Sequence, residues 1–69
     1  MQVMINGETE TIDEKDVSIS RLLAIKQVES PDMVSVQLNG KIVARQQYGQ
    51  QLLAADDEVE FLYFMGGGA

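Results

Sequence analysis

The chain has 69 residues, enough for one small domain, and 45% of them are hydrophobic, which is typical of a folded protein. It contains no histidine and no cysteine, which leaves almost no ligands for zinc and excludes Ser-His or Cys-His nucleophilic catalysis. A net charge of −6 disfavours nucleic acid and anionic membranes, and suits either a basic partner or simple solubility. No stretch approaches the roughly 20 apolar residues that span a membrane, and no signal peptide is visible, so we expect a cytoplasmic protein.

The chain opens with the pattern of a β-hairpin. Val3 and Ile5 share one face of a strand predicted over residues 2–6. Asn6-Gly7 follows and is typical of a type I′ turn, which requires positive φ at both central positions. A second strand is predicted over residues 8–12.

An amphipathic helix is predicted over residues 19–28, where apolar side chains recur at spacings of three and four. Ser18 is a favourable N-cap for this helix. Pro31 stops any continuation, because the residue before a proline avoids the α conformation. The helix therefore has one apolar face that must be buried against another element.

The second half of the chain predicts three more strands, over residues 33–38, 42–43 and 58–64. Asn39-Gly40 forms the turn between the first two of them. Residues 46–53 read as an irregular or single-turn segment. The side chains expected to anchor this segment to the core are apolar or aromatic: Tyr48, Leu52 and Leu53.

The first and last strands are predicted to pair at the centre of the sheet, because each carries apolar residues on both faces. A right-handed connection through the helix makes this pair parallel. The prediction is an α+β fold of the β-grasp type, as in ubiquitin: a mixed sheet of four to five strands with one main helix packed on one face. On the last strand, one set of side chains shares a face and the other set points away from the helix: Val59, Phe61 and Tyr63, against Leu62 and Phe64.

The chain ends in a glycine run followed by an alanine: Gly66, Gly67, Gly68 and Ala69. Glycines have no side chain to bury and lose the most backbone entropy on ordering. Residues 66–69 are therefore predicted to be a flexible tail, projecting from a domain of residues 1–65 and able to enter a narrow channel in a partner. Considered alone, the tail fits an appended linker or a frayed end equally well.

Four segments together resemble the ThiS/MoaD-type sulfur-carrier proteins, and the ThiS branch most closely: residues 3–8, 18–23, 36–45 and 56–61. The third is the most specific, because it is similar to the family's Asn-Gly-x-Ile-Val-x-Arg stretch and is followed by an aromatic residue at Tyr48. The order and spacing of the segments extend the resemblance over essentially the whole chain.

The resemblance implies that a ubiquitin-activating-like adenylyltransferase uses ATP to convert the carboxylate of Gly68, which follows Gly67, into an acyl-adenylate. A sulfur donor then produces a thiocarboxylate, and a synthase accepts the sulfur for thiamin thiazole or a related metabolite such as an amino acid. Ala69 is implied to be an extension that a metalloprotease removes. The chain is expected to be a monomer that binds no cofactor and is a co-substrate rather than an enzyme.

Partner contacts are expected near the tail. An exposed apolar patch is expected at three residues: Leu62, Phe64 and Met65. The sequence is equally compatible with the alternative that Tyr48 and residues 52–53 fold over this patch. Arg45 pairs either with a partner or with a local carboxylate, and the local pairing is favoured.

Three other functions remain compatible with the sequence. A molybdopterin-synthase small subunit would also carry a thiocarboxylate, but would stay docked on a large subunit. A protein modifier would form isopeptide bonds with lysines, and a non-catalytic β-grasp interaction module would keep its tail unaltered.

Overall fold

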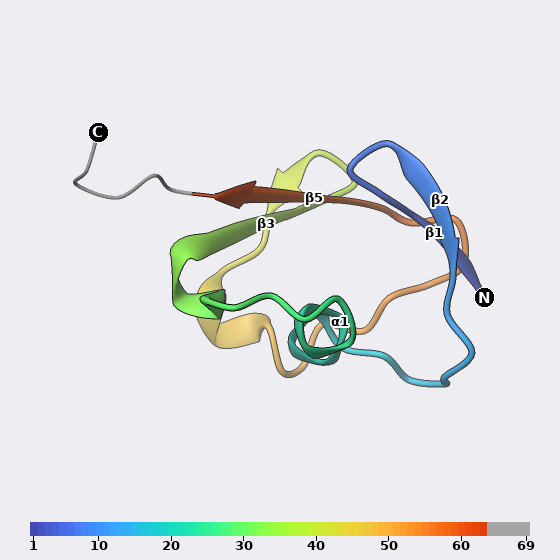
Figure 1. Ribbon diagram of the computed structural model, residues 1–69, viewed down its shortest axis with the longest axis horizontal. Helices are drawn as coiled ribbons and strands as arrows, with labels where there is room; N and C mark the ends of the chain where they lie inside the picture. The colour runs from blue at the N-terminus through green and yellow to red at the C-terminus, as the bar shows by residue number, and fades with distance from the viewer. Residues whose placement is uncertain (64–69) are drawn as a thin grey trace.

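The computed structural model describes residues 1–63, which form one sheet with a helix packed on one face (Figure 1). The described residues contain five strands: β1 (Gln2–Ile5), β2 (Glu8–Thr11), β3 (Val34–Leu38), β4 (Lys41–Ile42) and β5 (Glu58–Tyr63). They also contain one α-helix and two short 3₁₀ helices: α1 (Ile19–Ile25), η1 (Pro31–Met33) and η2 (Arg45–Gln47). No helix in this part of the chain is long and apolar enough to cross a membrane.

Strand β5 occupies the centre of the sheet, whose order is β2-β1-β5-β3-β4. β1 runs parallel to β5, with Ile5 beside Val59, and β3 runs antiparallel to it, with Val36 beside Phe61. The predicted parallel pairing of the first and last strands is confirmed. The predicted α+β class and β-grasp arrangement are confirmed with it.

Two Asn-Gly turns fix the register of the antiparallel pairs at either side of the sheet. Asn6 and Asn39 both have φ +52°, and the glycines after them both have φ +84°. Positive φ at both central positions is the requirement of a type I′ turn, so both predicted hairpins are confirmed. The bounds of the second hairpin differ by one residue, because Met33 belongs to η1 and Val43 lies after the end of β4.

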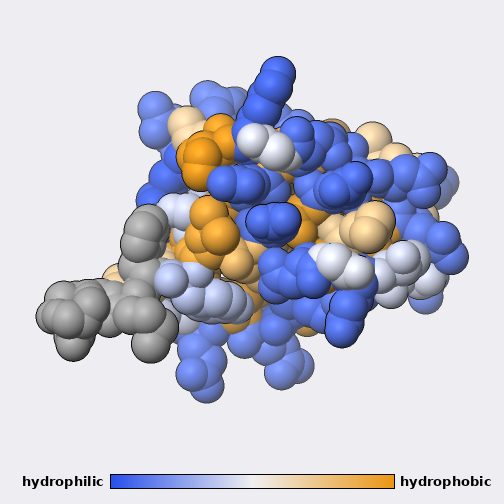
Figure 2. Space-filling view, turned by 90° about the horizontal axis from the view of Figure 1, so that it is seen from above, coloured by the Kyte–Doolittle hydropathy of each residue, from blue (hydrophilic) through white to orange (hydrophobic). Residues whose placement is uncertain are grey.

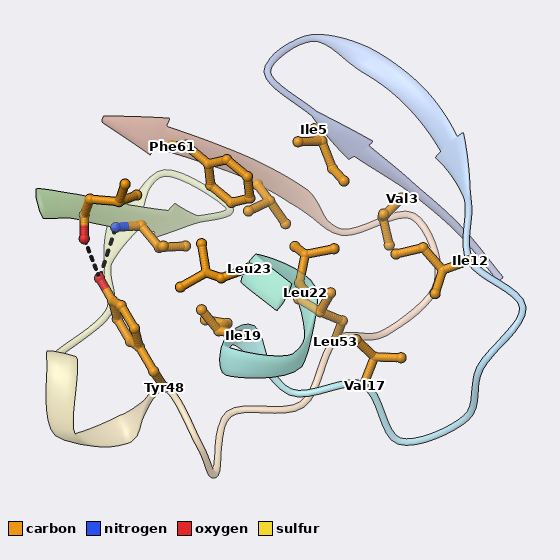
Figure 3. Close-up of a cluster of buried hydrophobic side chains, with 13 residues drawn as sticks. Val3, Ile5, Ile12, Val17, Ile19, Leu22, Leu23, Tyr48, Leu53 and Phe61 are labelled. Carbon is orange, nitrogen blue, oxygen red and sulfur yellow. Dashed lines mark hydrogen bonds between the residues drawn. The ribbon is translucent and has the colours of Figure 1, made fainter. Parts of the chain in front are cut away.

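Helix α1 begins where the sequence predicts. Ser18 is in an extended conformation, and its hydroxyl accepts a hydrogen bond from the N–H of Arg21 at 3.0 Å. The helix buries Ile19, Leu22 and Leu23 against the sheet (Figure 3).

The end of α1 differs from the prediction, because the helix stops at Ile25 and does not continue to Val28. Gln27 adopts φ +57°, which turns the chain out of the helix. Its N–H donates to the carbonyl of Ala24, and the N–H of Val28 donates to that of Leu23, each at 3.0 Å. This pair of bonds is a Schellman closure, here made with glutamine where glycine is usual.

The core lies between α1 and the sheet (Figure 3). Its buried side chains come from every layer of the fold: Val3, Ile5, Ile12, Val17, Ile19, Leu22, Leu23, Val34, Val36, Tyr48, Leu53, Val59 and Phe61. Leu52 was a predicted anchor, but it is 47% exposed. The reason is that Leu52 forms an extended bridge with Ser18, so consecutive side chains point in opposite directions and the next residue, Leu53, faces inward.

Candidate functional site

The candidate site begins at the carboxyl end of β5, where the last described residues lie beside β3. Leu62 is paired with Ser35, and Tyr63 with Val34. The other predicted site residues of this region lie outside the described residues: Phe64, Met65, Gly66, Gly67, Gly68 and Ala69. The structure therefore defines the strand that precedes the glycine run.

Burial changes sharply along β5. Val59 and Phe61 are buried against α1, at 1% and 7% exposure. Tyr63 is predicted on the same face as Phe61, yet it is 57% exposed. β1 pairs with β5 only at Glu58 and Val59 among the described residues, so Tyr63 lies where one flanking strand has ended.

The open face of the sheet, opposite α1, combines apolar and acidic side chains, visible as orange areas among blue ones in Figure 2. Glu58, Glu60 and Leu62 alternate with the buried residues of β5 and so share this face. Met4 lies beside Glu58, and Ile42 is the neighbour of Gln37 on β3. The strand residues on this face include no lysine or arginine within residues 1–63, so the face is acidic as well as partly apolar.

Leu62 is an exposed apolar residue near the carboxyl end of β5, at 39% exposure. Tyr48 and Leu53 are buried in the core on the α1 side of the sheet, so they do not cover it. The alternative in which that segment folds over Leu62 is therefore wrong.

Both turn asparagines bind the backbone of β5, Asn39 at its start and Asn6 past its middle. The Oδ1 atom of Asn6 accepts from the N–H of Phe61 at 2.9 Å. The Oδ1 atom of Asn39 accepts from the N–H of Glu58 at 2.9 Å, and its Nδ2 donates to Asp57 at 3.0 Å. Sequence reasoning assigned these asparagines to turns and missed their bonds to β5, because nothing local identifies a partner 55 residues away.

Within residues 1–63, Arg45 pairs with backbone carbonyls and with no carboxylate, so the favoured prediction of a local carboxylate partner is wrong for the described part of the chain. Its Nη1 donates to the carbonyl of Pro31 and its Nη2 to the carbonyl of Val34, each at 3.0 Å. The guanidinium carbon also lies 5.5 Å from the centre of the Tyr48 ring, within cation–π range. The two carbonyls attract the guanidinium because they carry partial negative charge; one belongs to the first residue of η1 and the other to the first residue of β3.

A hollow of about 500 Å³ lies next to Arg45 on the α1 side, and its lining includes Ser20 and Asp32. Within residues 1–63, no group of three or more acidic side chains is arranged to hold a metal ion.

The described ion pairs join α1 or the residue after it to the segments before it. Arg21 binds both carboxylate oxygens of Glu14, at 2.8 and 2.7 Å, and Lys26 binds Glu10 at 2.6 Å. The hydrogen bonds from Arg21 lower the pKa of Glu14, and the same contacts raise the pKa of Arg21. Both groups of the Glu14–Arg21 pair are exposed, so solvent screens this interaction.

The described residues form a mixed five-stranded sheet, whose parallel central pair is joined through a covering helix. This arrangement defines the class of small ubiquitin-like β-grasp proteins. The ThiS family model matches residues 3–68, so the chain belongs to the ThiS family, the sulfur carriers of thiamine biosynthesis.

Solved structures support the same assignment. The crystal structure of the thiamine biosynthesis protein ThiS from Geobacter metallireducens is 36% identical and superposes with a TM-score of 0.88, covering 99% of this chain and 100% of that one. The NMR structure of a thiamine biosynthesis protein from the same organism is also 36% identical, with a TM-score of 0.82, and covers 100% of this chain and 90% of that one.

A curated relative is much longer than this chain. The thiazole synthase of Magnetococcus marinus is 31% identical over 68 residues, which are 99% of this chain. The chain spans only 20% of the length of that protein. The similarity therefore concerns one part of the synthase.

Proposed function

We propose that this chain carries sulfur as a thiocarboxylate on the carboxyl group of Gly68, and that it is a co-substrate of partner enzymes rather than an enzyme. The observation that carries the proposal is the ThiS family match, which continues through Gly67 and Gly68. The position of β5 supports it, because the strand that precedes the glycines is the central strand of the sheet.

The chemistry needs an activating partner. A C-terminal carboxylate has a pKa of about 3.5, so it is ionised at neutral pH and its carbon is a poor electrophile. Attack of this carboxylate on the α-phosphorus of ATP forms an acyl-adenylate and releases pyrophosphate. Sulfide then adds to the acyl carbon and AMP leaves, so that one oxygen of Gly68 is replaced by sulfur.

Ala69 blocks this route as long as it is present, because the carbonyl of Gly68 is then part of an amide bond. We propose that a protease, by family resemblance a metalloprotease, removes Ala69 first. Glycine at the new terminus keeps the acyl carbon accessible, since it has no Cβ.

We propose that the open face of the sheet docks the adenylyltransferase. Glu58 and Glu60 make this face acidic, and Leu62 adds an exposed apolar contact at the end from which the chain continues to the glycines. A basic and partly apolar surface is complementary to it. Phe64 and Met65 extend the proposed contact by their place in the sequence.

The proposed acceptor of the sulfur is a thiazole synthase. Part of the Magnetococcus marinus thiazole synthase is 31% identical to this chain, so a carrier-like sequence and the synthase are joined in that protein. A carrier and an acceptor that act in consecutive steps benefit from such a link, because it raises their effective concentration.

The test compares full-length protein with protein that lacks Ala69, each incubated with ATP, sulfide and the cognate adenylyltransferase. Intact-mass spectrometry is expected to show an oxygen-to-sulfur exchange on the shortened protein and no change on the full-length protein. Equal yields from both, in the absence of protease, would refute the role of Ala69. Conjugation to lysines would instead identify a modifier, and an unaltered shortened protein would contradict the carrier function.

A further inference from the structure

The outer edge of β3 is the starting point. β4 pairs with β3 at Gln37 and Leu38, and the N–H of Val43 then donates to the carbonyl of Val36 at 3.0 Å. Within residues 1–63, no strand pairs with the outer edge of β3 beyond this bond. Backbone groups alternate in direction along a strand. Ser35 therefore presents its N–H and C=O to β5, where its partner is Leu62, while the two valines present theirs outward.

Two side chains occupy this edge in place of a strand, and we call Arg45 and Tyr48 the edge clasp. The Tyr48 hydroxyl accepts from the N–H of Val36 at 3.0 Å and lies 3.4 Å from the carbonyl of Val34, to which it donates (Figure 3). Arg45 donates to the same Val34 carbonyl and to that of Pro31. The clasp thus binds the N–H of Val36 and the carbonyl of Val34, whereas the N–H of Val34 bonds to Pro31 and the carbonyl of Val36 bonds to Val43. Arg45 also ties this strand to Pro31, the first residue of η1.

The clasp matters for β5 because the end of β5 has few other supports. The Oδ1 atom of Asn6 accepts from the N–H of Phe61, and β1 pairing has already ended at Val59. Leu62 and Tyr63 lie beside β3 residues only, among the strands described. If the hydrogen bonds at the outer edge of β3 are lost, the pairing of Leu62 and Tyr63 with β3 is therefore expected to weaken.

We propose that Arg45 and Tyr48 are positioning residues, which hold the last residues of β5 and so set the direction in which the proposed sulfur-carrying end leaves the sheet. This inference rests on the proposed carrier function. A fixed starting direction lowers the conformational cost of placing the end in the adenylyltransferase.

The chemistry of the clasp distinguishes it from a direct partner contact. A guanidinium is a planar fork that donates to two carbonyls at once, whereas an ammonium is a single charged point. Lysine at position 45 keeps the charge that a partner would attract, but does not reproduce the fork. The positioning role therefore predicts that Arg45→Lys impairs function, as Arg45→Met does.

The experiment uses protein without Ala69 in wild-type form and as Arg45→Lys, Arg45→Met and Tyr48→Phe. Hydrogen exchange measured by NMR is expected to accelerate about tenfold or more at the amides of Ser35 and Leu62, and to stay unchanged at Ile5. With adenylyltransferase, ATP and sulfide, the KM for each variant is expected to rise roughly three- to tenfold with little change in kcat, because ordering the end opposes binding.

Ser20→Arg is the matched control. Ser20 lines the hollow beside Arg45, and its side chain takes no part in the clasp, so a bulky charge there tests whether a partner enters the hollow. The positioning role predicts unchanged exchange and unchanged KM for this variant. A rise in KM as large as that of Arg45→Met would overturn it in favour of direct contact.

The remaining outcomes are decisive in different ways. Unchanged exchange at Leu62 in Arg45→Met and Tyr48→Phe overturns the clasp, and accelerated exchange with wild-type KM overturns its role in positioning. Wild-type kinetics for Arg45→Lys would assign Arg45 to a partner. Absence of thiocarboxylate on the wild-type protein would instead overturn the carrier function, and the exchange rates would still report whether the clasp holds β5.

Discussion

The two ends of β5 are supported in different ways. Its start is flanked by both β1 and β3, and the side chains of Asn39 and Asn6 bind the strand at Glu58 and Phe61. Its end lies beside β3, whose outer edge is closed by the side chains of Arg45 and Tyr48. One strand thus combines an anchored part, which runs through Phe61 in the core, with an exposed part at Leu62 and Tyr63 that precedes the proposed reactive end.

The largest expected difference in stability between the anchored and exposed parts of β5 comes from two aromatic residues on one face of the strand. Phe61→Ala removes a buried ring and is expected to lower the free energy of unfolding by about 3–5 kcal/mol. Tyr63→Ala removes a ring that is 57% exposed and is expected to cost less than about 1 kcal/mol. Chemical denaturation measures both, and equal losses would show that the core extends to Tyr63.

A smaller loss of stability is expected from changing the asparagine that supports the anchored part of β5. Asn6→Gly keeps the positive φ of the turn but removes the acceptor of the Phe61 N–H, a loss of about 1–3 kcal/mol in denaturation experiments. Asn6→Asp is the control, because it keeps an oxygen at that position and is expected to stay close to wild type. A full loss in Asn6→Asp would mean that the amide group is needed for another reason.

The smallest effect is expected outside β5, at the exposed pair of Glu14 and Arg21. Hydrogen bonds from Arg21 lower the pKa of Glu14 below its usual value of 4.5, so the pair stabilises the fold above that pH. The contribution is lost as the pH falls through the lowered pKa. An NMR titration of Glu14 checks that its pKa is lowered. Arg21→Gln is expected to return this pKa toward 4.5. An unchanged pKa in this variant would show that Arg21 does not cause the shift.

Much of the fold follows from local patterns in the sequence. Two Asn-Gly pairs, a serine N-cap and regular alternation on the strands are properties of adjacent residues, and each produced a correct element. The end of α1 was not predicted, because Gln27 adopts the left-handed conformation that glycine usually occupies at the end of a helix.

The candidate site was less predictable, because its contacts join distant residues. The partners of Arg45 are carbonyl groups, which every residue has, so no sequence pattern could select Pro31 and Val34. Strand alternation placed Leu62 away from the helix-covered face, but it left open whether other residues cover this side chain, which the structure shows to be exposed. The role of the terminal glycines came from family resemblance and remains a proposal.

The same asparagines that secure β5 also determine how the protein ages chemically. Asparagine before glycine is prone to lose ammonia and become an acid. At position 6 the bonded atom is an oxygen, which the acid retains, whereas at position 39 the lost nitrogen is the donor to Asp57. Deamidation of Asn39 would place two carboxylates face to face at the start of the central strand, so storage damage at this turn is expected to weaken the domain more than the same damage at the other.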